Sequence, residues 1–342
     1  MKTRPMGHPS AGAALLSPPG ASAGGDGARR LELAVLVHLA LFLLLATWGF
    51  GGNAPGPRRA MLAWGTLGFL LTCAGFGGRG GRRENWRRPL LWLAPLVLLD
   101  LLVAASAGNP ELRGISLAGE PMLLKTGGIP GLPGSAGPRA SLVALWLFNG
   151  IFLSCFNLVL LVRRRRRLRA LLLFAAGNAL VLAVFGTVQK LTDASGLYFG
   201  RVASPQAYFF ASFVYHNHWG AFVVLMAALC LGLVWHYARH ADRGFWHSPA
   251  FGGLLALLLL AASVPLSGSR SCTALLVVLL GGAFVRWAVA TARDRRRRRR
   301  SPAGPLLAGA LGVLAAGGLV YGLARPVIAQ RVAKTFEQAA VL

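Results

Sequence analysis

Long apolar runs alternate with short polar segments along the whole chain, and this pattern sets the expected fold. Nine runs approach or reach the ~20 residues needed to cross ~30 Å of hydrocarbon. The first follows Arg29 and Arg30 and ends near Phe50. The others cover residues 60–77, 89–107, 140–162, 168–190, 217–238, 250–267, 271–290 and 304–324. The pattern predicts an all-α fold, a polytopic membrane helix bundle of about nine transmembrane helices.

Composition agrees with a membrane protein and argues against other classes. Hydrophobic residues make up 55% of the 342 residues and charged residues only 13%, against about 25% in a typical soluble domain. The formal net charge of +26 would suggest a nucleic-acid partner in a soluble protein. Here the arginines stand in short blocks between apolar runs, where membrane proteins carry topology signals. We therefore expect no nucleic-acid partner.

The four cysteines are small buried hydrophobes in this interpretation. Cys73, Cys155, Cys230 and Cys272 each fall within or beside a predicted membrane helix. None is paired at the spacing of metal ligands. The cysteines therefore indicate neither a disulfide framework nor a metal site.

Three regions of the chain differ in composition. Residues 1–28 are rich in Gly, Ala, Ser and Pro without helical periodicity, which predicts a disordered tail. Residues 29–324 form the transmembrane helical domain, and residues 325–342 form a segment outside the membrane. A signal peptide is the alternative for the first apolar run. That run is too long for a signal core, and no convincing small-residue cleavage site follows it.

The distribution of basic residues fixes the expected orientation. With a cytoplasmic N-terminus, 24 of the 36 lysines and arginines fall in cytoplasmic segments and 11 in external ones. This matches the positive-inside rule and makes the C-terminus external. The arginine runs at 163–167 and 295–300 become cytoplasmic anchors, and binding of acidic membrane-lipid headgroups comes with that role.

This orientation places segments 51–59, 108–139, 191–216 and 325–342 outside the membrane. Segment 108–139 includes the glycine- and proline-rich stretch 127–134, so we expect an irregular loop there. The sequence Ser267-Gly268-Ser269-Arg270-Ser271 lies between two apolar runs, which predicts a very tight external turn.

The densest group of hydrogen-bonding side chains is Tyr215-His216-Asn217-His218-Trp219-Gly220, at the outer start of the sixth predicted helix. The eighth helix starts at the same face with Ser269, Arg270 and Ser271. A helix N-terminus carries unpaired N–H groups and partial positive charge. If the two helices pack together, a phosphate or diphosphate would meet backbone donors, hydroxyls, an arginine and imidazoles in one place.

These residues also have plainer explanations. Asn217 would cap the sixth helix, with Tyr215 and Trp219 in the interfacial aromatic belt. Arg270 would snorkel to the lipid headgroups instead of holding an anion. Arg201, shortly before the cluster, would be an ordinary solvated charge instead of folding over the site.

The two histidines are not equivalent in this interpretation. His216 and His218 are two positions apart, so on one helix they do not share a face. We therefore expect one of them at most to point into a site, and His218 is favoured.

Other polar residues leave alternatives open. Asp100 is a carboxylate deep inside a predicted helix, which is either a functional group or a structural partner of an arginine, Asn149 or Asn157. Asn178 also lies deep. Arginines near other outer helix starts, Arg58, Arg59 and Arg139, make an arginine at such a start weak evidence by itself.

Several of these stretches together resemble the O-antigen ligase/polymerase superfamily of bacterial envelope glycosyltransferases. They are Val188-Gln189-Lys190-Leu191-Thr192 at a helix end, Asn217-His218 at a helix start, and Ser269-Arg270 in the turn. Ser271 stands where the superfamily usually has glycine. The glycine- and proline-rich stretch 127–139 is similar to the external loop that precedes a membrane helix there. The resemblance covers roughly residues 90–340.

The resemblance implies transfer of a glycan from undecaprenyl-diphosphate to an acceptor hydroxyl on a lipid or another glycan. It implies the outer face of the bacterial cytoplasmic (inner) membrane, no cofactor and no metal. Arg270, Arg201, Asn217 and Ser269 would bind the diphosphate, and His218 or His216 would serve as the base. Superfamily members continue into a large external domain whose histidine is commonly assigned as the base. Segment 325–342 would be the start of such a domain and has no histidine.

We therefore carry three expectations for function. The first is a glycosyltransferase of the O-antigen ligase type. The second is a catalytically incomplete relative that binds carrier lipid or assists a partner chain, which could supply the missing external domain. The third is a transporter, which would bind its substrate near the bilayer midplane. The polar residues gather at the outer face, which favours the first two.

Overall fold

The computed structural model describes residues 23–77, 87–117, 119–125, 127–206, 208–239 and 244–340. The long helices of this part of the chain are α1 (Ala23–Trp48), α2 (Pro55–Gly77), α3 (Arg87–Gly108), α4 (Pro138–Leu161), α5 (Arg165–Leu191), α6 (His216–Arg239), α7 (Pro249–Ser267), α8 (Arg270–Arg297) and α9 (Ala303–Ala340). Two 3-10 helices, η1 (Phe50–Gly52) and η2 (Phe245–His247), and two strands, β1 (Leu112–Leu117) and β2 (Glu120–Lys125), complete the elements.

Each long helix holds a stretch that is long and apolar enough to cross a membrane, which makes nine such helices among the described residues. Their outward surfaces carry large apolar side chains, for example Leu98 on α3, Val278 on α8 and Leu314 on α9. In water this surface would be very costly to expose, whereas lipid tails cover it without cost. The expected polytopic helical bundle is confirmed to this extent.

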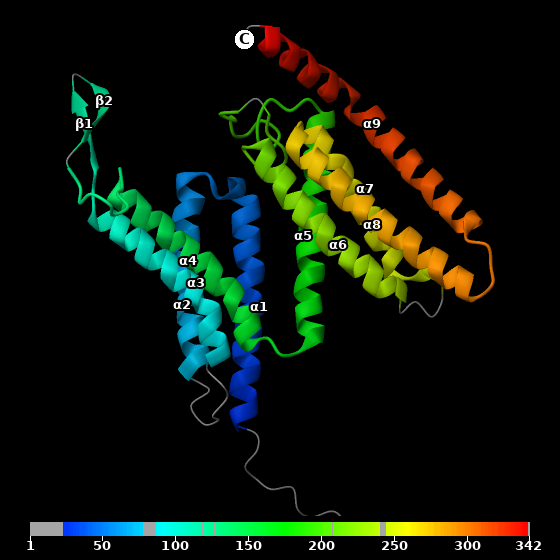
Figure 1. Cartoon of the computed structure of the whole chain (residues 1–342), viewed down its shortest axis with the longest axis horizontal. Helices are drawn as coiled ribbons and strands as arrows, with labels where there is room; N and C mark the ends of the chain where they lie inside the picture. Colours follow the sequence, from blue (N-terminus) through cyan, green and yellow to red (C-terminus); the bar gives the residue numbers. More distant parts are fainter. Residues whose placement is uncertain are drawn as a thin grey trace, which may run out of the picture.

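Successive helices run in alternating directions, so their connections gather at two opposite ends of the bundle (Figure 1). The end at the top of Figure 1, called the upper face here, carries the connections α1–α2, α3–α4, α5–α6 and α7–α8. The opposite end, called the lower face, carries the connections α4–α5 and α8–α9. The starts of α2, α4, α6 and α8 therefore all lie at the upper face, as the sequence predicts.

The helix ends differ from the predicted boundaries at both ends of the chain. Residues 1–22 of the predicted tail lie outside the described residues, but α1 already begins at Ala23, so residues 23–28 are helical. At the other end, α9 continues from the predicted membrane run through segment 325–342 as far as Ala340. Adding residues to an existing helix needs no new nucleus, so composition alone places such ends poorly.

Segment 108–139 is not irregular throughout, which corrects the prediction for this segment. Strands β1 and β2 form an antiparallel hairpin that pairs Leu112 with Lys125 and Leu117 with Glu120. Gly119, with φ of 87°, provides the left-handed conformation in its turn. The rest of the segment is loop, held by Asn109, whose side-chain amide donates to the Ile129 carbonyl and accepts from the Ile129 N–H.

Helices α2 and α4 approach each other closely because glycines face each other at their contact. A Cβ on Gly150 would lie 2.8 Å from the Cα of Gly65. Further along, a Cβ on Gly68 would lie 2.3 Å from the Ser154 hydroxyl. Small residues permit this packing in membranes, where helix association relies on close contact and on hydrogen bonds.

Polar side chains reinforce the same contact. Asn157 is fully buried, donates to the Gly68 carbonyl (2.9 Å) and accepts from the Thr72 hydroxyl (3.0 Å). The Ser154 hydroxyl donates to the Gly150 carbonyl, so the Nε2 proton of His38 on α1 donates to Ser154 (2.9 Å). Asn157 therefore has a structural role between α2 and α4.

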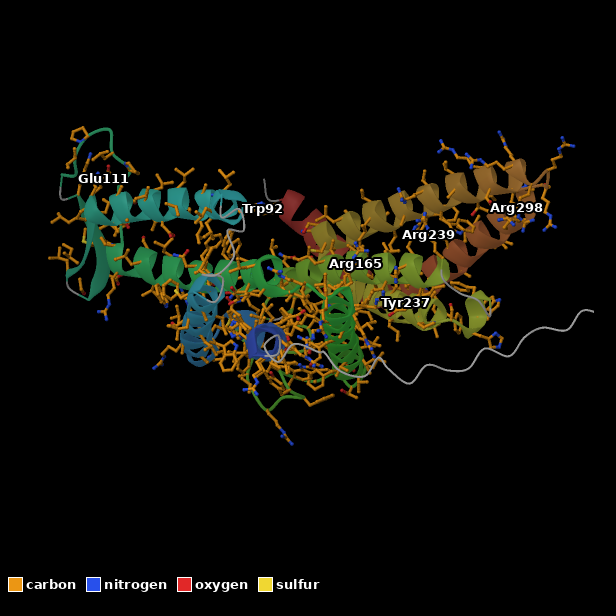
Figure 2. The ribbon with its side chains drawn as sticks, turned by 90° about the horizontal axis from the view of Figure 1, so that it is seen from below. Trp92, Glu111, Arg165, Tyr237, Arg239 and Arg298 are labelled. Carbon is orange, nitrogen blue, oxygen red and sulfur yellow. The ribbon has the colours of Figure 1, made fainter. Side chains whose placement is uncertain are left out.

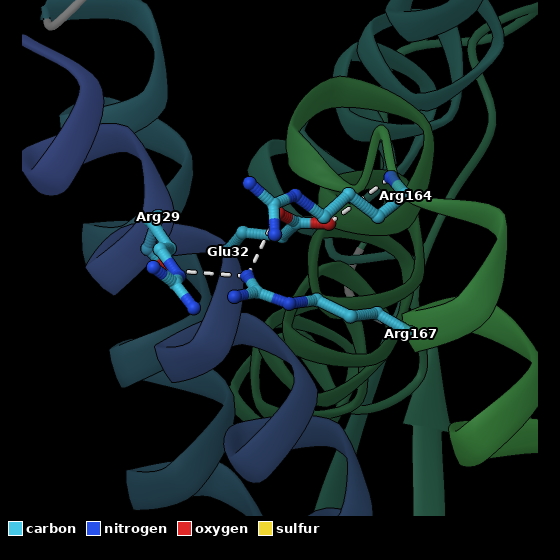
Figure 3. Close-up of polar contacts among 4 residues, drawn as sticks. All are labelled: Arg29, Glu32, Arg164 and Arg167. Atoms are coloured by element: carbon cyan, nitrogen blue, oxygen red, sulfur yellow. Dashed lines mark hydrogen bonds and ion pairs between the residues drawn. The ribbon is translucent and has the colours of Figure 1, made fainter.

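An ion pair fastens α1 to the α4–α5 connection at the lower face (Figure 3). The Arg167 guanidinium lies 2.8 Å from the Glu32 carboxylate, and the Arg164 N–H donates to the other carboxylate oxygen (3.2 Å). Arg167 also donates to the Arg29 carbonyl. Arginine run 163–167 was expected to anchor on lipid headgroups. The Arg167 charge is paired with Glu32 inside the protein, and the anchoring role of the run stays a prediction.

We predict that Gly150→Ala destabilises the protein, because the added methyl group must push α2 and α4 apart. Overpacking of this kind typically costs ~1–3 kcal/mol. Gly177→Ala on α5 is the matched control, since nothing lies within 4 Å of its added Cβ. Thermal unfolding of the purified protein in detergent measures both variants. Equal melting temperatures for the two would contradict the close α2–α4 contact.

Candidate functional site

The starts of α6 and α8 pack directly against each other, which was the condition for a shared site. A Cβ on Gly220 would lie 2.6 Å from the Cβ of Cys272, so only glycine permits this approach. The Ser269 hydroxyl donates to the side-chain oxygen of Asn217 at 2.8 Å. The Cys272 thiol lies 3.6 Å from the Asn217 carbonyl. The structure thus brings together Asn217 and Ser269, two of the predicted site residues.

The turn between α7 and α8 is as tight as predicted. Helix α7 ends at Ser267 and α8 begins at Arg270. Gly268 joins them with φ of 80°, a left-handed conformation that favours glycine at a helix C-terminus. Ser269 is buried and bonded to Asn217, so its hydroxyl serves the α6–α8 contact. Arg270, the next residue, is exposed at the upper face.

The plainer explanation of the α6 start is wrong in two details. The Tyr215 carbonyl accepts the first helical N–H groups, those of His218 and Trp219, so Tyr215 and not Asn217 holds the capping position. Trp219 is 0% exposed and stacks on Phe210 with ring centroids 4.9 Å apart. It belongs to the core and not to an interfacial aromatic belt.

The two histidines make different hydrogen bonds. His216 Nδ1 lies 3.2 Å from the Tyr208 carbonyl, which only accepts, so Nδ1 carries a proton and neutral His216 has its lone pair on Nε2. The side-chain nitrogen of Asn53 lies 3.2 Å from His218 Nδ1 and donates to it. Neutral His218 then carries its proton on Nε2, which makes that atom a donor.

Hydrogen bonds to the end of α1 fix the upper-face segment that joins α5 to α6. The Tyr198 hydroxyl donates to the Trp48 carbonyl, and the Ser212 hydroxyl donates to the Thr47 carbonyl at 2.5 Å. Burial raises the pKa of the Tyr198 phenol, so the hydroxyl stays a donor through neutral pH. Asn178 on α5 accepts from the Trp48 indole N–H and donates to Thr47, so it has a structural role here.

Arg201 lies in this segment, exposed. Among the described residues, no hydrogen bond or ion pair connects its side chain to His218, Asn217 or Arg270. The place of Arg201 in the site therefore stays a prediction.

A cavity of about 670 Å³ opens beside the predicted site, between the starts of α2 and α4. Its lining consists of Asn53, Pro55, Arg58, Arg59, Leu62, Gly137, Pro138, Arg139, Ala140 and Val143. Three arginines and two helix N-termini meet there, an arrangement suited to an anion. Asn53 belongs to this lining and also bonds His218, so the cavity and the α6 start share a wall.

An apolar groove continues the cavity along α2 and α4. Its lining is Leu62, Arg139, Leu142, Val143 and Trp146, of which Leu62, Arg139 and Val143 also line the cavity. The Trp146 side chain is 45% exposed, and its indole N–H donates to Thr66 at 3.2 Å. The two spaces together offer a cationic end and an apolar end to one molecule.

This cavity was not predicted from the sequence, because an arginine near a helix start is common. A signal was present, however. Pro55 and Pro138 stand at the starts of α2 and α4, the positions that favour proline. Arginine follows each of them within four residues, on two helices that share the upper face. What the sequence could not show is that α2 and α4 are neighbours.

Asp100, the deep carboxylate, has one of the structural partners expected for it. Its Oδ1 accepts from the Asn149 side-chain N–H at 2.9 Å, which joins α3 to α4. No group of three or more histidine, cysteine or acidic side chains suited to a metal ion occurs within the described residues.

The bond between Asn217 and Ser269 should contribute measurably to stability. We predict a coupling of ~0.5–1.5 kcal/mol in a double-mutant cycle of Asn217→Ala and Ser269→Ala, the usual net value for a hydrogen bond. Unfolding in detergent supplies the four free energies. The control is the cycle of Asn217→Ala with Ser271→Ala. Ser271 is exposed two residues after Ser269, so this pair should show no coupling. Additive effects of the first pair would contradict the contact.

No protein-family model matches the chain, and no curated protein or solved structure matches it either. The likeness to the O-antigen ligase/polymerase superfamily therefore stays a prediction that rests on short motifs. Any function must be argued from the residues that meet at the upper face.

Proposed function

We propose that this protein is a membrane glycosyltransferase of the O-antigen ligase type, which takes a glycan from an undecaprenyl-diphosphate carrier. In this proposal the upper face is the outer face of a bacterial cytoplasmic membrane, and the N-terminus is cytoplasmic. The observation that carries the proposal is the arginine cavity that opens into an apolar groove and shares Asn53 with His218.

The cavity supports an anionic headgroup. Arg58, Arg59 and Arg139 supply three guanidinium groups, which bind phosphate oxygens in pairs. The starts of α2 and α4 add partial positive charge, although Pro55, Pro57 and Pro138 in their first turns have no N–H to donate. A diphosphate carries more charge than a single phosphate, and so gains more from three arginines than from one. Arg270 remains a proposed ligand from the neighbouring α8 start.

The groove supports a lipid tail on the same molecule. Leu142, Val143 and Trp146 face outwards from α4, where a bilayer would surround them. A chain of apolar carbons leaving the cavity would follow these side chains into the bilayer. The combination favours an amphiphile with an anionic head over a soluble phosphate.

The chemistry requires a base and an anion clamp. The acceptor hydroxyl loses its proton to a base, its oxygen attacks the anomeric carbon, and the sugar–phosphate bond breaks with its electron pair going to the diphosphate. The arginines stabilise that negative charge. Protonation favours His216 as the base, because its lone pair is on Nε2, whereas His218 in its bond with Asn53 presents a donor. Position favours His218, as the sequence did, because His218 bonds the Asn53 side chain that lines the cavity.

A catalytically incomplete carrier-binding protein is the second candidate. The observation in its favour is that both histidines and Asn53 form hydrogen bonds within the protein. In this candidate these bonds have a structural role, and the cavity binds the carrier without any transfer of the glycan. A transporter finds less support. The deep polar side chains Asp100, Asn157 and Asn178 are each bonded to a neighbouring helix, which leaves them as structural contacts.

We expect Arg139→Gln to weaken binding of undecaprenyl diphosphate about 10- to 100-fold, since a hydrogen bond to a charged group contributes ~1.5–3 kcal/mol. Lys125→Gln at the end of β2 removes the same charge outside the cavity lining and should leave binding unchanged. Carrier affinity of the purified protein in detergent, titrated with the lipid, gives the comparison. Equal loss in both variants would remove the cavity from the proposal.

His216→Ala should lower the transfer rate by ~10²–10⁴, the usual contribution of a general base, with carrier affinity retained. His218→Ala should weaken carrier binding and lower the rate less. The assay follows loss of undecaprenyl-diphosphate-linked glycan in reconstituted membranes supplied with an envelope acceptor. Carrier binding without any transfer by the unaltered protein would favour the carrier-binding candidate. A larger rate loss in His218→Ala would restore His218 as the base.

A further inference from the structure

Two arginines from different helices share one indole ring near the lower face, remote from the candidate site. The Arg239 guanidinium carbon lies 4.8 Å from the centre of the Trp235 ring, and that of Arg286 lies 5.0 Å from it. Arg239 belongs to the last turn of α6, and Arg286 to the lower part of α8. Figure 2 views the bundle from this end and labels Arg239 and its neighbour Tyr237. Because each guanidinium carbon lies within 5.0 Å of the same ring centre, the two carbons are at most about twice that distance apart.

Arg286 sits in lipid-facing surroundings. It is exposed, and its neighbours Val285 and Val289 are 60% and 43% exposed. It falls inside the apolar run that the sequence assigned to the membrane, ahead of the arginines that follow at 293 and 295–300. A charge at that depth is costly unless it is paired or reaches the headgroup region. The Trp235 ring holds the guanidinium in place but, being uncharged, does not neutralise it.

No acidic side chain that the structure describes forms an ion pair with either arginine. The described pairs with arginine use Glu32 and Asp294, and their partners are Arg167 and Arg298. Arg239 and Arg286 are therefore two like charges held at one indole ring, and both side chains are exposed. An anion within reach of both guanidinium groups would offset the repulsion between these like charges.

We infer that Trp235, Arg239 and Arg286 form a binding site for a phosphate group at the lower face, and that an anionic phospholipid of that leaflet supplies it. A phosphate diester offers oxygens to both guanidinium groups, and the acyl chains of the same lipid lie against Val285 and Val289. Basic pockets between transmembrane helices bind acidic lipid headgroups in this way. This site differs from the arginine runs because the Trp235 ring fixes the positions of both cations.

Three variants separate this site from plain attraction between charges and lipid. Arg286→Gln removes one cation, whereas Trp235→Leu keeps both cations and removes the ring that positions them. Arg293→Gln, two turns further along α8 and also exposed, is the matched control. Each full-length protein is reconstituted in nanodiscs of mixed phosphatidylglycerol and phosphatidylcholine, and the phosphatidylglycerol retained per protein is counted by native mass spectrometry.

The inference predicts that Arg286→Gln and Trp235→Leu each lower phosphatidylglycerol retention by at least about fivefold, while Arg293→Gln retains the wild-type amount. Arg286→Lys, which keeps the charge without the planar fork, should fall between them. Equal losses in Arg286→Gln and Arg293→Gln, or wild-type retention in Trp235→Leu, would overturn the site. In lipid-poor detergent, stabilisation of the wild-type protein but not Arg286→Gln by inorganic phosphate would assign the site to a soluble phosphate and overturn the lipid assignment.

Discussion

The approach of α2 to α4 at Gly65 and Gly150 is the contact on which the proposed site depends. Both helices start at the upper face, so a close contact between them also brings their N-termini together. The two prolines fix where the helices begin, and the arginines that follow them then face one shared space. Within a bilayer no hydrophobic effect drives two helices together, because lipid tails are as apolar as the side chains. The association of α2 with α4 therefore relies on glycine packing and on the hydrogen bonds of the buried Asn157.

The second half of the site also depends on a close approach of two helices at a glycine. Gly220 permits α6 to touch α8 at Cys272, and the bond between Ser269 and Asn217 fixes the register of the two starts. The α1–α2 turn then joins the two halves, because Asn53 reaches His218 while Phe213 packs against Gly51 of η1. The starts of α2, α4, α6 and α8 thereby lie together at the upper face.

Much of this arrangement could be read from the sequence, and the reasons for the misses are physical. Apolar run lengths predicted the nine helices, and the short link from Ser267 to Arg270 predicted the tight turn. The sequence also placed Asn217 and Ser269 at two helix starts that could meet, although it predicted them as diphosphate ligands and not as partners of each other. It missed the arginine cavity because which helices become neighbours depends on glycine contacts between distant segments. It misplaced Trp219 because an indole at a helix start looks interfacial until Phe210 is seen to cover it. The hairpin was hidden within a glycine- and proline-rich segment.

An experimental structure of the protein in nanodiscs with undecaprenyl diphosphate would test the cavity most directly. We expect the diphosphate to lie between Arg58, Arg59 and Arg139, with the first carbons of the lipid against Leu142 and Trp146. The terminal phosphate, to which the glycan is attached in the loaded carrier, should point toward His216 and His218. A diphosphate bound at Arg270 with the cavity empty would contradict the central claim. So would a lipid found away from both α2 and α4.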